Sequence, residues 1–306
     1  MARQQKLKRV TDISKPVNVA FNIVLIFLAI AAVFPLLFVL SISLSSKESI
    51  LKFGYQLIPS EVTLESYKTI LKSGSQIVQA FRNSIIITVV GTLLGLFTTV
   101  SYAYAVSRHD FKYRKFFNFI AFLPMLFSGG LAASFVVNTR ILGFQDKMYA
   151  LILPPLLSAY NIVVMRTFFQ TSVPFALIEA AQIDGASEMQ IFFQIVLPIS
   201  LPGVATIALF LSLGYWNDWM NAMLYLKQNS PLQPLQYLLM QIQKNIEVII
   251  QKKGQMGSIA DEALATLPED GIRMAIVVVA TLPIALSYPF FQRYFVEGLT
   301  LGAVKA

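Results

Sequence analysis

The residues with the clearest chemical potential lie in one polar stretch, 172–203, between long apolar runs. Its three carboxylates belong to Glu179, Asp184 and Glu188. It also carries a strip of small residues: Ala180, Ala181, Gly185 and Ala186. Carboxylates accept hydrogen bonds from a cationic partner, and small residues let another surface approach the backbone. Taken alone, this pattern fits a docking surface and a connector packed on the chain's own helices equally well.

A second group of candidate residues lies in the fifth apolar run, where we expect Asp218 at membrane depth. A charged side chain there costs about 2.5–3.5 kcal/mol, so it is a functional candidate. Its neighbours are Trp216, Asn217 and Trp219. Aromatic faces together with amide and carboxylate groups suit a sugar, and we place Asn161 on the same substrate pathway. The alternatives are a hydrogen bond between helices or an interfacial tryptophan belt.

Several kinds of active site are missing from the sequence. It has no Gly-Lys pair and therefore no phosphate-binding P-loop, no H-E-x-x-H and no G-x-S-x-G. Cysteine is absent, and the only histidine is His109, in a charged loop. We therefore predict neither an enzyme nor a metal site, and no cofactor on this chain.

The composition predicts an all-α polytopic membrane protein. Of 306 residues, 56% are hydrophobic and only 13% are charged, and the mean hydropathy is +0.65. Soluble domains usually carry about 25% charged residues. The net charge of +8 fits Lys and Arg that flank membrane spans and face lipid headgroups. We expect membrane lipid as a partner and no nucleic acid.

Six apolar runs predict six transmembrane helices in a domain over 17–295. The predicted spans are about 17–44, 84–107, 116–137, 148–169, 204–226 and 273–291. Each is long enough for the roughly 30 Å of a bilayer core. A polar segment, 227–272, precedes the last span, and 1–16 and 296–306 are tails. The total of basic residues does not orient the chain, but five in the first fifteen residues and four over 108–115 favour both termini in the cytoplasm.

Local signals predict a helix, a turn and a second helix within 171–203. Thr171 or Ser172 would cap a helix that begins near Pro174, and Gly185 would take a left-handed turn. Ser187-x-x-Gln190 is a capping box, and Pro198 would stop the second helix. Elsewhere, Gly91-x-x-x-Gly95 predicts close helix packing, and residues 235–249 have a helical period.

One spacing in this stretch resembles the EAA loop of ABC importer permeases. The pattern is Glu179-Ala180-Ala181, three residues, Gly185, nine residues, Ile195, one residue and Leu197-Pro198. Its place after the fourth of six spans matches that family, and Asp184 and Ala186 fit the variant of the sugar importers. Three weaker features resemble carbohydrate-importer permeases of the maltose or polysaccharide type: segment 165–169, the cluster 216–219 and the ending 294–305.

The resemblance implies a type I importer fold and a transport subunit in the cell membrane. A loop over 171–203 would seat in a cytoplasmic ATPase, which holds ATP and Mg, and would couple ATP hydrolysis to alternating access. The docking residues would be Glu179, Ala180, Ala181, Asp184, Gly185 and Ala186. The partners would be a second, different permease, two ATPase copies and an extracytoplasmic solute-binding protein. The cargo would be a carbohydrate, an oligosaccharide.

Two other functions stay open on the sequence. One is an EAA permease for an amino acid, a phosphonate or a metal complex. The other is a secondary transporter or channel without an ATPase. Such proteins often carry several ionisable groups at mid-membrane, whereas we place one here. Segment 227–272 would pack on the outer vestibule or contact the binding protein.

Overall fold

The computed structural model describes residues 15–72, 75–127, 129–256 and 269–303. Within these ranges every element of regular secondary structure is a helix, and the only β-bridge is an isolated one between Ser45 and Val62. The predicted all-α fold is therefore confirmed. The chain divides into two compact units. One comprises Met1–Thr69 and Glu262–Val278, and the other comprises Ile70–Asp261 and Val279–Ala306.

The first unit is built on α1 (Lys15–Ser43), an apolar helix whose central window is not buried within the chain. Pro35 lies inside α1 without ending it, as expected for a span. Ser46 caps the short α2 (Lys47–Phe53) by accepting from the Ser49 N–H. Helix α3 is Glu65–Lys72. The exposed apolar surface of α1 therefore suits lipid or another membrane subunit.

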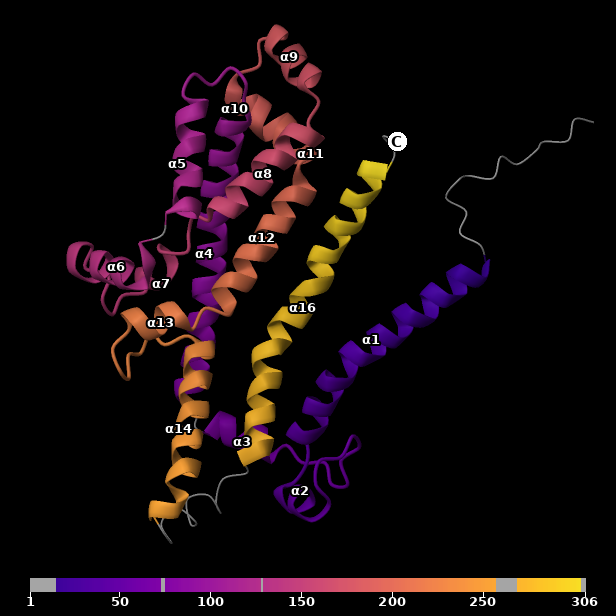
Figure 1. Cartoon of the computed structure of the whole chain (residues 1–306), viewed down its shortest axis with the longest axis vertical. Coiled ribbons are helices and arrows are strands. Elements are labelled where there is room, and N and C mark those ends of the chain that lie inside the picture. Colours follow the sequence, from indigo (N-terminus) through magenta and orange to yellow (C-terminus); the bar gives the residue numbers. More distant parts are fainter. Residues whose placement is uncertain (1–14, 73–74, 128, 257–268, 304–306) are drawn as a thin grey trace, which may run out of the picture. The chain divides into compact units, whose positions relative to one another are not determined.

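Three helices form the core of the second unit (Figure 1): α4 (Ser75–Ser107), α8 (Ala159–Ser172) and α12 (Leu201–Trp216). Helices α4 and α12 approach closely at the two predicted glycines. A Cβ atom on Gly91 would lie 2.5 Å from the Tyr215 ring, and one on Gly95 would lie 3.2 Å from Leu211. The packing role of the Gly91-x-x-x-Gly95 spacing is thus confirmed.

The other elements precede α8 or follow α12 in the chain. Before α8 come α5 (Arg114–Leu126), α6 (Gly130–Val136), the π-helix η1 (Val137–Ile141) and α7 (Tyr149–Ile152). After α12 come α13 (Met220–Tyr225), α14 (Leu235–Met256) and α16 (Glu269–Ala303). Helix α14 confirms the helical period read over 235–249.

Three helices of the described residues are long and apolar enough to cross a membrane: Pro16–Ser43, Gln76–Ser107 and Asp270–Gln292. Three bent helix pairs also pass if each counts as one span, which gives up to six. Three predicted spans are not continuous helices. The run 116–137 is broken between α5 and α6, the run 148–169 between α7 and α8, and the run 204–226 between α12 and α13. Pro154-Pro155 lies in the break before α8, and the polar residues 217–218 lie in the break before α13.

Candidate functional site

The segment 171–203 folds as two helical pieces joined by a tight turn. Helix α9 (Phe175–Ile183) follows α8 at a bend of 74°. The second piece, Glu188–Ile199, meets α12 at a bend of 80°. Figure 1 shows α9 and α10 at one end of α4 and α12, away from α13 and α14. The segment therefore turns back at the end of the spans.

The turn at Gly185 is a Schellman motif, in which a left-handed residue closes the end of a helix. Gly185 has φ +80° and donates its N–H to the Gln182 carbonyl at 3.1 Å. The Ala186 N–H donates to the Ala181 carbonyl at 2.9 Å. These bonds satisfy carbonyls that a helix end would otherwise leave free. The sequence prediction of a left-handed glycine is confirmed.

The second piece starts as predicted and ends later than predicted. Ser187 and Gln190 form the capping box of α10 (Glu188–Gln190). The chain continues through the π-helix η2 (Ile191–Val196) and α11 (Leu197–Ile199), and the break falls at Ser200. Pro198 therefore does not stop the helix. It occupies the first turn of α11, where a missing N–H is tolerated.

The predicted cap at the start of α9 is wrong. Helix α8 runs on to Ser172, and the Thr171 hydroxyl donates backwards to the Thr167 carbonyl at 3.0 Å. Pro174 is the N-cap residue of α9, with no side-chain cap. A hydroxyl within a helix can bond the carbonyl four residues before it, which removes the capping role.

The predicted docking residues divide into an exposed set and a buried residue. Glu179, Ala180, Asp184 and Gly185 are exposed, and Ala186 is half-buried. Ala181 is only 8% exposed and belongs with Ile178 to the core of the unit. Two residues one turn apart thus anchor α9 to its own chain, while the rest of the helix surface stays free.

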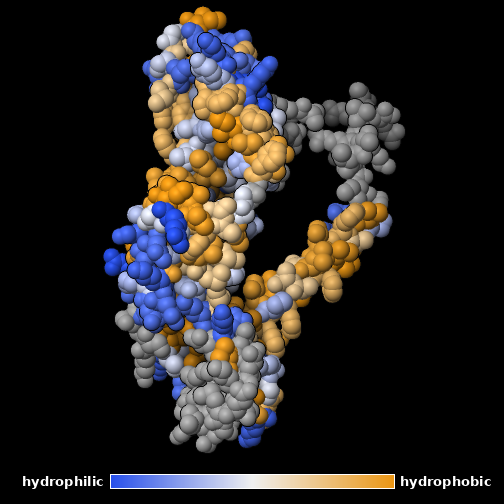
Figure 2. Space-filling model, turned by 60° about the vertical axis from the view of Figure 1, so that its left-hand side comes forward, coloured by the Kyte–Doolittle hydropathy of each residue, from blue (hydrophilic) through white to orange (hydrophobic). Residues whose placement is uncertain are grey.

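Large apolar side chains are exposed beside these acids. Ile183 is 87% exposed and Met189 is 69% exposed. Figure 2 shows hydrophilic atoms near both ends of the unit's visible face and mainly hydrophobic atoms between them. Large apolar side chains exposed among charged ones are typical of a protein-binding surface, and Ile183 and Met189 fit this description.

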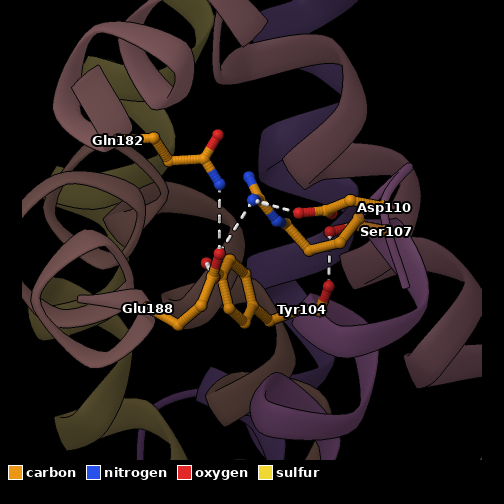
Figure 3. Close-up of polar contacts among 6 residues, drawn as sticks. Tyr104, Ser107, Asp110, Gln182 and Glu188 are labelled. Atoms are coloured by element: carbon orange, nitrogen blue, oxygen red, sulfur yellow. Dashed lines mark hydrogen bonds and ion pairs between the residues drawn. The ribbon is translucent and has the colours of Figure 1, made fainter. Parts of the chain in front are cut away.

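An ion-pair network joins this segment to the end of α4 (Figure 3). The Arg108 Nη2 lies 2.9 Å from a Glu188 carboxylate oxygen and 2.9 Å from Asp110. The Tyr104 hydroxyl donates to Glu188 at 2.8 Å, and Gln182 donates to Glu188 at 3.3 Å. Arg108 is 6% exposed, so its charge depends on these partners.

Sequence reasoning missed this network. In the sequence, Arg108 stands out only as one of four basic residues over 108–115, and Glu188 was not among the predicted docking residues. The two residues are 80 positions apart, and no local spacing links them. Only the position of Glu188 directly after the Ser187 cap carries a signal, because acids are favoured in the first turn of a helix.

Four of the five predicted substrate-pathway residues, 216–219, lie at the opposite end of α12. Trp216 is its last residue and is buried, and its indole N–H donates to the Ala280 carbonyl at 2.9 Å. The ring also packs edge-on against Phe81. This geometry gives Trp216 a packing role between helices.

Asp218 lies outside the helices of its predicted span, in the break between α12 and α13. It accepts the Asn221 N–H, in the first turn of α13, at 3.0 Å. Asn217 donates to the Leu213 carbonyl at 3.0 Å. Trp219 is 37% exposed, and Asn161 is buried in the first turn of α8. The four residues 216–219 therefore form a helix break, and Asn161 lies apart from them in the sequence on another helix.

No group of three His, Cys, Asp or Glu side chains that could hold a metal ion occurs in the part of the chain that the structure describes. The arrangement at 171–203 offers contacts to a macromolecule: exposed carboxylates, exposed apolar side chains and a rigid turn.

Comparison with known proteins identifies what this segment belongs to. Residues 91–300 match the family "Binding-protein-dependent transport system inner membrane component". The chain belongs to this family. Its members are membrane permease subunits of ABC transporters, so the EAA resemblance is confirmed.

Several relatives match over nearly their whole length. The polygalacturonan/rhamnogalacturonan transport system permease protein YtcP of Bacillus subtilis is 39% identical, over 92% of this chain and 95% of its own. Protein LplC of the same organism is 36% identical, over 89% of each chain. The arabinooligosaccharides permease AraQ of Halalkalibacterium halodurans is 30% identical, over 91% of this chain and 93% of its own.

A solved structure has the same fold. It is a bacterial ABC transporter involved in the import of the acidic polysaccharide alginate. The match has a TM-score of 0.75 and 27% identity, and it covers 92% of this chain and 99% of that one. The type I importer fold predicted from the sequence is therefore confirmed.

Proposed function

We propose that this chain carries an oligosaccharide across the cell membrane as one permease subunit of an ATP-driven importer. Two of the relatives described above are named for polygalacturonan/rhamnogalacturonan and for arabinooligosaccharides, and the structural neighbour is involved in the import of the acidic polysaccharide alginate. These names favour a carbohydrate over the amino acid, phosphonate or metal complex that the EAA pattern alone allows. The alternative of a transporter without an ATPase has lost its basis, since the family is one of ABC permeases.

The observation that carries the coupling proposal is the exposed turn around Gly185. Helix α9 is anchored through Ile178 and Ala181, so a force on its exposed face would move the segment as a rigid body. Glu179 and Asp184 present carboxylates to a cationic groove, and Ile183 supplies an apolar anchor between them. An ATPase seated here would push α9, and the bend into α12 would pass that motion to a span.

The proposed docking of an ATPase at α9 also implies the orientation of the chain and the other subunits of the importer. The segment 171–203 and both termini lie in the cytoplasm, and the chain is multi-pass. A second, different permease completes the pathway, and two ATPase copies hold ATP and Mg. An extracytoplasmic binding protein delivers the sugar to the α13–α14 end.

The coupling proposal is tested with Gly185→Val. A β-branched residue at φ +80° is strained, by about 1–2 kcal/mol. No other heavy atom lies within 4 Å of an added Cβ, so the strain falls on the turn itself. We expect ATP-dependent uptake to be lost while the amount of protein in the membrane stays near the wild-type level.

Gly143→Val is the matched control. Gly143 has φ +64°, and a Cβ there also meets no atom within 4 Å, but it lies between η1 and α7. This variant should have the same strain and keep uptake. Normal uptake by Gly185→Val, or equal loss in both variants, would contradict docking at the turn.

The cargo is tested by growth of a strain lacking this gene on a panel of oligosaccharides. We expect loss of growth on one class of oligosaccharide and normal growth on glucose. Growth that fails instead on an amino acid or a phosphonate would contradict carbohydrate import.

A further inference from the structure

A cavity of about 480 Å³ lies between α13, the loop after it and α14, within one compact unit. Its volume falls in the range of about 300–1,000 Å³ typical of small-molecule sites. Its lining includes Gln228, Asn229, Tyr237, Met240, Gln241 and Lys244. The cavity belongs neither to the segment 171–203 nor to the cluster 216–219.

The cavity lies at the opposite end of α4 from the coupling segment. Asn83 donates to the Pro231 and Gln233 carbonyls at 2.8 and 3.1 Å, which holds the loop to the start of α4. At 1.5 Å per residue, α4 from Asn83 to Ser107 is about 36 Å long, more than the roughly 30 Å of a bilayer core. If the coupling segment is cytoplasmic, the cavity faces the side from which an importer takes its cargo.

The wall of the cavity is held in place by contacts of α13 with the segment from α6 to α7. Tyr225, at the end of α13, accepts from the Asn138 amide at 2.7 Å. Its carbonyl accepts the Asp146 N–H at 2.8 Å, and its ring stacks on Phe135. Tyr237 on α14 is only 8% exposed. The cavity is therefore preformed, as small-molecule sites usually are.

The polar groups of the lining suit a sugar that carries a carboxylate. Amide groups of Gln228, Asn229 and Gln241 can both donate to and accept from hydroxyls. Among the described residues, none of these side chains nor Lys244 takes part in a hydrogen bond or ion pair. No acid lines the cavity in the part of the chain that the structure describes. Lys244 therefore gives it a positive charge without a counter-charge.

We infer that this cavity is an outer subsite for one uronate unit of an oligosaccharide on its way into the importer. Lys244 would meet the carboxylate, the amides would meet the hydroxyls, and Tyr237 would form an apolar wall against the ring. This inference rests on the proposed carbohydrate function. It adds that the importer prefers acidic sugars and that this preference arises at the cavity beside Lys244.

The test uses the assembled importer in proteoliposomes, with its binding protein and with ATP on the ATPase side. The two probes are a galacturonate trimer and its methyl ester, which differ in charge and share their ring hydroxyls. Lys244→Met should raise the KM for the trimer about tenfold and leave that for the ester unchanged. The same binding protein serves every variant, so its selectivity cancels in the ratio of variant to wild type.

Two further variants serve as controls: one removes a lysine outside the cavity, and the other removes a neutral group of the cavity lining. Lys147→Met removes an exposed lysine of the η1–α7 region that does not line the cavity, and should leave both KM values unchanged. Gln241→Leu should raise the KM for both probes by a similar few-fold factor, since hydroxyl recognition does not depend on the carboxylate. A Lys244→Met variant that shifts both probes equally, or neither, overturns the subsite. An importer that carries no oligosaccharide at all overturns the proposed function instead.

Discussion

The two ends of α4 are tied to later parts of the chain by different chemistry. At the α9–α10 end, Arg108 pairs with Glu188, and Tyr104 donates to the same carboxylate. At the α13–α14 end, Asn83 donates to backbone carbonyls, and Ser84 accepts the Leu235 N–H at 2.8 Å. One end depends on charged side chains and the other on neutral bonds to backbone.

This difference has a mechanical consequence. The neutral bonds hold a loop by its backbone, which suits a fixed support for a preformed cavity. The ion pair holds Glu188 through a buried guanidinium, so loss of either partner would leave the other charge without its counter-charge. We therefore expect variants at the first end to lower uptake per molecule in the membrane. Variants at the second end should lower stability while uptake per folded molecule is maintained.

The largest expected effect comes from Arg108→Met. Glu188 and Asp110 would lose their common partner, and only the neutral donors Tyr104 and Gln182 would remain on Glu188. Truncating one member of a buried pair costs about 3–5 kcal/mol, and the cost here is near the lower limit because Glu188 is 54% exposed. We expect uptake to fall by more than tenfold, measured against the amount of subunit in the membrane.

Arg82→Met is its control at the opposite end of the same helix. Arg82 is exposed, so the same substitution should change stability by less than about 0.5 kcal/mol and leave uptake unchanged. Uptake by Arg108→Lys should lie between the values for Arg108→Met and wild type. Lysine keeps the positive charge but lacks the planar guanidinium that reaches both acids. An equal effect of Arg82→Met and Arg108→Met would remove the contrast between the two ends.

Asn83→Leu tests the neutral end. It would leave the Pro231 and Gln233 carbonyls without their donor, at a cost of about 2 kcal/mol, since the side chain is buried. The melting temperature should drop by about 4–8 °C, from the usual scaling for domains of this size. Uptake per folded molecule should stay near the wild-type value. Ser84→Ala breaks one bond of the same support and should produce about half the drop.

Tyr104→Phe gives a smaller change at the charged end. It removes one hydrogen bond to Glu188, worth about 1 kcal/mol, and leaves the ion pair in place. Uptake per molecule should fall a few-fold. Tyr102→Phe is matched to it, because Tyr102 donates to the Phe117 carbonyl at 2.7 Å and does not contact the coupling segment. A drop in uptake for Tyr102→Phe of the same size would show that any loosening of α4 slows transport.

The part of the molecule that the sequence predicted well is governed by local rules. The capping box at Ser187 and the left-handed Gly185 depend on neighbours within a few residues, and both are present. The close approach at Gly91 was predictable because only the lack of a side chain mattered. The EAA spacing likewise identified the segment before any contact was known.

The features that the sequence did not predict depend on distant contacts or on competing local bonds. Hydropathy treated 204–226 as one continuous run and did not register that the polar residues 217–218 separate two helices. Arg108 and Glu188 meet only because α10 folds back onto the end of α4. The cavity near Lys244 has contributions from α13, a loop and α14, and no periodicity in the sequence specifies such a space.

The smallest effect on melting temperature is expected from Asp146→Asn. This variant tests how the stability of the α13–α14 end depends on pH. A hydrogen bond from the Ser230 hydroxyl is the main reason why the pKa of Asp146 is lowered, and the Lys227 N–H and neighbouring lysines add to it. A carboxyl whose pKa is lower in the folded state adds stability above its ordinary pKa near 4. That contribution is lost as the pH falls through the lowered pKa. Wild type should therefore melt about 1 °C higher than Asp146→Asn at pH 7.

The gap between the two proteins should close as the pH is lowered below 4, because wild-type Asp146 is then protonated as well. Asn also tolerates the left-handed backbone at this position, where φ is 55°, so the substitution adds little strain of its own. Melting curves of both proteins over pH 3–7 measure the gap directly. A gap of constant size would mean that Asp146 holds the loop through its backbone N–H alone. The support of the cavity would then contain no charged side chain, which would make the contrast with the Arg108 end complete.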